Sequence, residues 1–137
     1  MPELNLIIRS FKGELTVSDI IQSSEIISKE RDFLPTMNFL NDIQETEFQI
    51  KEEDIIEVIN YYKTTSKVYA RRKSVHLTKT PTQVIFGTLM NLYKNETLVE
   101  LSVVSTLDAA LLKLDLPPGK KTSIMDVLEK NRIKNQN

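Results

Sequence analysis

The chain has 137 residues, 40% of them hydrophobic and 27% charged, which suits one globular domain with its own core. Its formal net charge of −1 lacks the basic excess of a nucleic-acid-binding surface, and the absence of cysteine excludes disulfides and thiol chemistry. No stretch has the length and apolarity of a membrane span, and Met1-Pro2-Glu3-Leu4 does not open a signal peptide. A cytoplasmic protein without membrane insertion is therefore expected.

Four times along the chain, a short apolar run is followed by a turn and then by an amphipathic stretch. We expect strands at about 4–11, 36–43, 74–78 and 98–104, and helices at about 16–31, around 55–62, from 80 onward and at 109–114. Capping chemistry marks three of the helix starts: Thr16-Val-Ser-Asp19, Thr80-Pro81 and Ser105-Thr-Leu-Asp108. This alternation predicts an α/β fold with a four- to five-stranded, mostly parallel sheet in a right-handed βα superhelix.

The predicted strands alternate apolar and polar residues, whereas parallel strands covered on both faces are almost continuously apolar. In the third strand, for example, Val75 and Leu77 flank His76. Helices are therefore expected mainly on one face, with the other face partly polar. We expect the domain to span residues 1–116, and residues 117–137 to be an extension with one weak helix and a frayed end.

Several of these segments together resemble bacterial STAS-like proteins, small relatives of anti-sigma factor antagonists and of the cytoplasmic domain of sulphate transporters. The resemblance covers about residues 3–116. It rests on Asp42 closing the second strand, on Arg71-Arg-Lys-Ser-Val-His-Leu-Thr78 leading into Thr80-Pro81, and on Ser105-Thr-Leu-Asp-Ala-Ala-Leu111. It implies a STAS-like fold and a regulatory, protein-binding role.

The sequence departs from the signalling members of that family in two places. Those members carry a phosphorylated Ser or Thr at the start of the helix after the second long strand. Here the segment reads Phe48-Gln-Ile-Lys-Glu-Glu-Asp54, which has no hydroxyl and is already strongly acidic. The phospho-switch is therefore not transferred. The family's antiparallel first strand is short or missing as well, since only Met1 to Glu3 precede the first expected strand.

The carboxyl edge of the sheet is the best place for a ligand, because strand ends of open α/β sheets converge there. Hydroxyls, helix starts and one lysine at this edge are suited to a small anion. Capping alone also explains Thr80 and Ser105, and we favour that interpretation. The chain has only 3 glycines and no glycine-rich phosphate loop. The candidate ligand-binding residues are Asp42, Thr78, Lys79, Thr80, Ser105 and Thr106.

His76, the single histidine, invites a catalytic interpretation with Glu100 and Ser102 on a neighbouring strand. Catalysis needs a nucleophile, an oriented base and an oxyanion site together, and the spacing shows none of these arrangements. An exposed strand histidine is the preferred interpretation. We expect no catalytic residues, no metal site and no cofactor.

The third helix has an apolar arc wider than half of its circumference, which exceeds what packing on one side of a sheet requires. The excess residues Phe86, Met90 and Tyr93 are the candidate interface with a partner or a second copy of the chain. Coverage by neighbouring helices is the alternative, and both stay open. The sequence favours a non-catalytic, protein-binding regulatory module. The alternative is a carrier of a small molecule or lipid, bound between helices and sheet or at the carboxyl edge.

Overall fold

The computed structural model describes residues 1–48, 51–65 and 70–134 of the chain. Its strands are β1 (Leu6–Leu15), β2 (Asn38–Phe48), β3 (Arg72–Leu77) and β4 (Val99–Val104). Its α-helices are α1 (Val17–Ser28), α2 (Glu52–Thr64), α3 (Pro81–Asn91), α4 (Lys94–Thr97), α5 (Leu107–Lys113) and α6 (Lys121–Lys134). Short 3-10 turns lie at Pro2–Leu4 and Pro118–Lys120.

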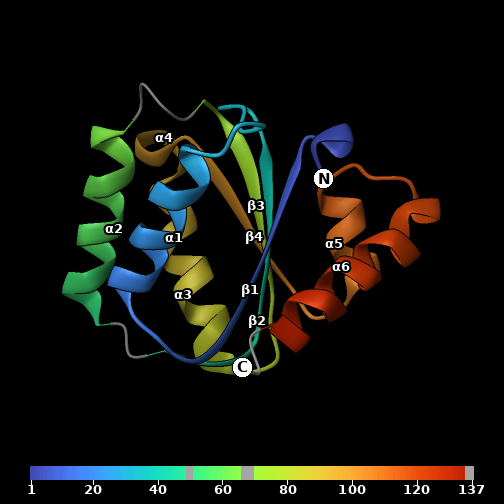
Figure 1. Cartoon of the computed structure of the whole chain (residues 1–137). Helices are drawn as coiled ribbons and strands as arrows, with labels where there is room; N and C mark the ends of the chain where they lie inside the picture. The colour runs from blue at the N-terminus through green and yellow to red at the C-terminus, as the bar shows by residue number, and fades with distance from the viewer. Residues whose placement is uncertain (49–50, 66–69, 135–137) are drawn as a thin grey trace.

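The strands form one sheet in the order β1-β2-β3-β4, and every neighbouring pair is parallel (Figure 1). The predicted α/β fold with a parallel sheet is therefore confirmed. In the described part of the chain the element before β1 is the 3-10 turn, and no antiparallel strand precedes β1. The strands β1 and β2 run four and five residues further than expected, to Leu15 and Phe48.

Helices cover both faces of the sheet, so the expectation of an open, partly polar second face is wrong. The helices α1, α2, α3 and α4 lie on one side, while α5 and α6 lie on the other (Figure 1). Each side has its own apolar core, because successive side chains of a strand point to opposite faces. Phe39 and Ile43 of β2 belong to the first core, whereas Leu40 belongs to the second.

The C-terminal segment belongs to the domain rather than extending from it. The expected helix around Ile124, Val127 and Leu128 is present as α6, and it packs against β1 and α5. Ile124 and Leu128 are buried in the second core, together with Leu6 and Leu40 of the sheet. The frayed end predicted for residues 135–137 lies outside the described residues. Within the described ranges, no helix has the length and apolarity to cross a membrane.

The helix α3 lies unusually close to the sheet. A Cβ atom added at Gly87 would be 2.3 Å from the side chain of Val103 and 2.9 Å from that of Leu101, both on β4. The missing side chain therefore lets the helix backbone approach β4. This close approach buries a wide arc of the helix, including Phe86 and Met90.

Truncation of Ile124 tests whether α6 is part of the core. Ile124 is fully buried, so Ile124→Ala should lower the free energy of unfolding by roughly 2–5 kcal/mol through lost burial and the cavity left behind. The neighbouring Met125 is 51% exposed, so Met125→Ala is the matched control and should change it by less than about 1 kcal/mol. Urea unfolding measures both. Equal effects of the two substitutions would contradict a docked α6.

Candidate functional site

The middle of β2 contains an irregularity, level with the end of β3, that places Asp42 at the centre of a polar cluster. Between Ser10 and Lys12 of β1 there is one residue, whereas their partners Asp42 and Glu45 are separated by two. This bulge turns the chain beside Asp42, which accepts hydrogen bonds through Oδ1 from the backbone N–H and the side-chain amide of Gln44, at 3.2 and 3.0 Å. The carboxylate thereby holds the bulge in place.

The other oxygen of Asp42 binds the C-terminal helix. Arg132 of α6 donates to Asp42 Oδ2 from Nε at 3.2 Å and from Nη2 at 2.9 Å. Asp42 is only 3% exposed, while the side chain of Arg132 is about half exposed. A carboxylate removed from water needs such charged and hydrogen-bonded partners, so this pair fixes where α6 lies on the sheet.

Most of the other predicted ligand-binding residues use their polar atoms within the fold. The hydroxyl of Thr78 is buried and donates to the carbonyl of Val104 at 3.0 Å. Thr80 and Thr106 cap α3 and α5, each accepting a hydrogen bond from a backbone N–H three residues later. The cap of α5 is therefore Thr106 and not Ser105. The Lys79 ammonium lies 3.8 Å from Glu45, and both side chains are exposed.

Gln83 secures this edge from the other side of the sheet. It is almost completely buried, and its amide donates to the carbonyls of Gln44 and Thr46 at 3.3 and 3.0 Å. Its oxygen accepts from the N–H groups of Lys79 and Thr80, which completes the capping box of α3. The carboxyl edge is thus pre-organised from both faces, by α3 and by α6.

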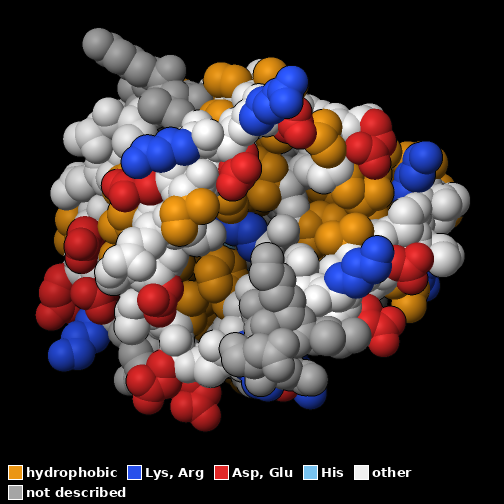
Figure 2. All heavy atoms as spheres, in the orientation of Figure 1, with side chains coloured by type: hydrophobic (Ala, Val, Ile, Leu, Met, Phe, Trp, Pro, Cys, Tyr) orange, Lys and Arg blue, Asp and Glu red, His pale blue; other side chains and the backbone are white. Residues whose placement is uncertain are grey.

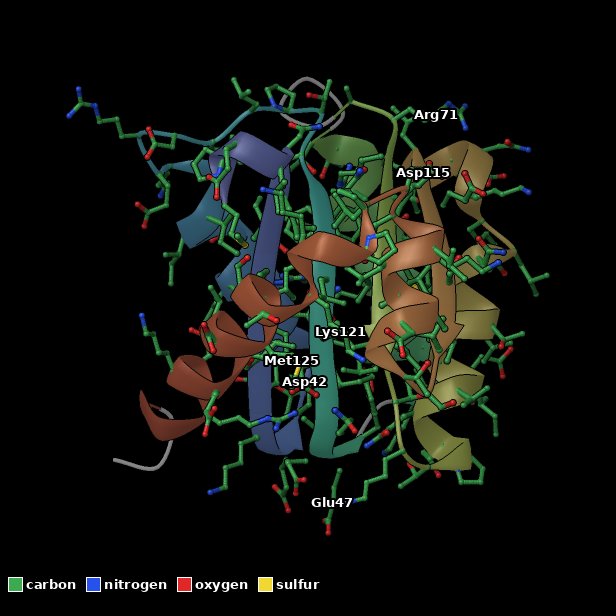
Figure 3. The ribbon with its side chains drawn as sticks, turned by 90° about the vertical axis from the view of Figure 1, so that its right-hand side faces the viewer. Asp42, Glu47, Arg71, Asp115, Lys121 and Met125 are labelled. Atoms are coloured by element: carbon green, nitrogen blue, oxygen red, sulfur yellow. The ribbon has the colours of Figure 1, made fainter. Side chains whose placement is uncertain are left out.

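A groove of about 520 Å³ lies beside the Asp42–Arg132 pair, between α5, α6 and the carboxyl ends of the strands. Its size falls within the range of small-molecule sites, roughly 300–1,000 Å³. Figure 3 shows Lys121 and Met125 of α6 in front of the sheet, over the part of β2 that contains Asp42. Of the predicted ligand-binding residues, only Ser105 lines the groove directly. The full lining is Gln44, Leu77, Ser105, Leu107, Lys121, Met125, Leu128, Glu129 and Arg132.

Five of these nine residues lie on α6, and sequence reasoning missed all of them. Arg132 is 90 residues away from Asp42, so no local spacing reports their contact. The only signal was the helical spacing of Ile124 and Leu128, which indicates that one side of this segment is buried. Once the helix is assigned to the core, the same spacing indicates which residues lie on its other side, where they can line a groove.

His76 does not lie where the sequence suggested. In the register of β3 and β4, Lys73 pairs with Glu100 and Val75 with Ser102, whereas His76 pairs with Val103. His76 therefore faces α3, on the opposite side of the sheet from Glu100 and Ser102. It is only 7% exposed, so the expectation of an exposed histidine is wrong, and its ring stacks on Phe86 at 6.0 Å between centroids.

The apolar interior beneath α1 and α3 also contains a few buried polar groups and has little free space. Arg9 donates to Asn41 at 2.7 Å and lies over the Phe39 ring, and Asn41 donates to Ser74 at 3.0 Å. The space left among these groups and His76 is about 40 Å³, enough for a few water molecules only. This interior is therefore packed, and the groove at α5 and α6 is the better ligand site.

The predicted interface residues of α3 divide between core and surface. Phe86 and Met90 are buried in the first core, so neither is accessible to a partner and the prediction is wrong for both. Neighbouring elements cover them, as the alternative interpretation held. Tyr93 is partly exposed and stays a candidate. The apolar surface of α3 lies instead on its outer side, at Val84, Ile85, Leu89 and Leu92.

Within residues 1–48, 51–65 and 70–134, no three His, Cys, Asp or Glu side chains are grouped to hold a metal ion. Comparison with protein-family models, curated proteins and solved structures gives no match for the chain. The resemblance to STAS-like proteins thus stays a prediction.

The ionisation of His76 gives a direct test of this interior. Burial, with a smaller contribution from the positive charge of Arg9, lowers the pKa of His76 from 6.5 to about 3. Since it is the single histidine, its imidazole proton resonances should stay unchanged from pH 8 to about pH 5 in the folded protein and titrate near 6.5 in urea. Proton NMR of protein without a histidine tag measures both.

The lowered pKa also predicts how stability depends on pH. The unfolded chain takes up a proton at His76 below about pH 6.5 and the folded chain does not. The contribution of neutral His76 to the free energy of unfolding is therefore present above pH 6.5. It is lost as the pH falls toward 3, by up to about 1.4 kcal/mol per pH unit. An imidazole that titrates near 6.5 in the folded protein would contradict the buried position.

Proposed function

We propose that this protein is a non-catalytic binding module that docks another protein chain, in the first instance a second copy of itself, through the outer side of α3. The observation that carries the proposal is the chemistry of that helix. Pro81–Asn91 contains no charged residue, while every other described α-helix contains at least two. A helix with one face on a sheet ordinarily has charged and polar residues on its outer side.

The outer side of α3 is also broadly apolar. At 100° per residue, the arc opposite Gln83, Phe86 and Met90 holds four exposed apolar side chains, Val84, Ile85, Leu89 and Leu92, with the exposed Thr88 among them. The neighbouring α2 differs, because it begins with Glu52, Glu53 and Asp54. Acidic side chains gather in Figure 2 over the end of α2 that is lowest in Figure 1. Because α2 is charged and α3 is not, the outer side of α3 is the surface suited to be buried against another chain.

Self-association fits this surface better than a charged partner does. A two-fold symmetric interface must complement itself: a charge at the axis would meet its own copy, and a charge elsewhere would need an opposite charge on the same patch. A helix without charges avoids that repulsion. The same absence leaves nothing on α3 to pair with a basic or acidic partner.

A second candidate function, carrying a small molecule, is favoured by a separate observation. The groove beside Asp42 has the volume of a ligand site and combines apolar and polar side chains from four parts of the chain. It lies on the opposite face of the sheet from α3, so both functions can operate in one molecule.

Sedimentation velocity over a wide concentration range tests the first proposal. We expect reversible dimers of the wild-type chain, and expect Ile85→Glu to shift the dissociation constant by more than about tenfold toward monomer, because it buries a charge at the interface. Ile56→Glu on α2 is the matched control, since Ile56 is 55% exposed and Ile85 is 58% exposed. It should leave association unchanged.

Circular dichroism confirms that both variants stay folded. A wild-type chain that is monomeric at every concentration would contradict self-association. Equal dissociation constants for Ile85→Glu and wild type would place the interface away from α3.

A further inference from the structure

We propose that the groove between α5 and α6 binds a small amphipathic carboxylate, with its apolar body on the groove floor and its carboxylate on Arg132. This inference rests on the carrier function and names the class of ligand. The groove floor is built from Leu77 of β3, Leu107 of α5, and Met125 and Leu128 of α6. Leu77 and Leu128 are buried, whereas Met125 is half exposed at the opening. An apolar chain or ring fits this surface.

One edge of the Arg132 guanidinium is hydrogen-bonded to Asp42, and another edge is open. Its Nε and Nη2 both donate to a single oxygen of the buried Asp42. Its Nη1 makes no hydrogen bond to a residue in the described part of the chain, and Nη2 has a second hydrogen. The edge formed by Nη1 and Nη2 is therefore available as a fork, which is the geometry that matches a carboxylate through two parallel hydrogen bonds.

Asp42 makes this arginine a pre-organised donor. An arginine free in solution loses rotamer entropy when it binds a ligand, whereas Arg132 is already fixed by two hydrogen bonds to a buried carboxylate. Asp42 is fixed in turn by Gln44 through two further hydrogen bonds. The ligand carboxylate would thus meet a cation whose orientation depends on the bulge in β2.

The other charges around the groove do not make it positive overall. Recognition of an anion therefore depends on directed hydrogen bonds and not on net charge. Lys121 pairs with Asp108 at 3.0 Å, and Glu129 lines the groove on the same helix as Arg132. Counted with Asp42 and Asp108, the site has three acids and two bases, so its net charge does not attract an anion. A multiply charged anion gains little from such a site and meets Glu129. A ligand with one carboxylate and an apolar body uses both the arginine fork and the floor.

Titrations with sodium octanoate and with uncharged 1-octanol test the proposal on the full chain, below the concentration at which octanoate forms micelles. Amide chemical shifts report the location and calorimetry the affinity. We expect saturable octanoate binding with shifts confined to α5, α6 and the strand ends beneath them. Octanol should bind at least about tenfold more weakly, because it lacks the group that matches the arginine fork.

Position 125 offers a matched pair of variants, since Met125 is half exposed and either substitution leaves the core intact. Met125→Glu places a like charge beside the ligand and should weaken octanoate binding about tenfold or more, whereas Met125→Lys should not weaken it. Arg132→Lys keeps a positive charge beside Asp42 but removes the fork, and should also weaken binding. Leu112→Glu, at an exposed position of α5 outside the groove, should have no effect.

Each other outcome overturns the inference in a distinguishable way. Octanol binding in the groove as tightly as octanoate would overturn the carboxylate class and leave the carrier function standing. No saturable binding of either probe would overturn the carboxylate class together with the carrier function. Octanoate binding that Met125→Glu and Leu112→Glu weaken equally would overturn the groove as its site.

Discussion

The ion pair between the buried Asp42 and Arg132 is the interaction on which the second face of this protein depends. It joins the middle of β2 to the last helix across 90 residues of chain, and it occupies a carboxylate that is nearly free of water contact. Removing Arg132, which is itself half exposed, would leave the buried carboxylate of Asp42 without its charged partner, which is costly in a protein interior. With the pair in place, α6 covers Leu6 and Leu40, and its outer flank becomes a wall of the groove.

The opposite face is organised by close packing. The absence of a side chain at Gly87 brings α3 against β4, and the buried amide of Gln83 ties the start of the helix to β2. This packing uses Phe86 and Met90 for the core and leaves only the outer arc exposed. The two proposed surfaces therefore share the strand β2 but lie on opposite sides of the sheet.

The sequence predicted those features that depend on residues near each other in the chain. The capping boxes at Thr16 and Thr80 and the four apolar runs report on local hydrogen bonds and local burial, so the strands and helices are found near their expected places. It could not assign His76 to a face, because that depends on the register between β3 and β4. It likewise could not place Arg132. The alternation of apolar and polar residues does not indicate an open face, since a polar residue such as Asp42 is satisfied within the interior by Arg132 of α6.

Hydrogen exchange of the α6 amides measures the central claim most directly. If the Asp42–Arg132 pair docks α6 on the sheet, amides around Ile124 and Leu128 should be protected in the wild-type chain. In Asp42→Asn these amides should exchange markedly faster. The amides of β2 and β3 at residues whose side chains lie in the first core should keep their protection. Unprotected α6 amides in the wild type, or the same α6 exchange rates in Asp42→Asn, would contradict the account.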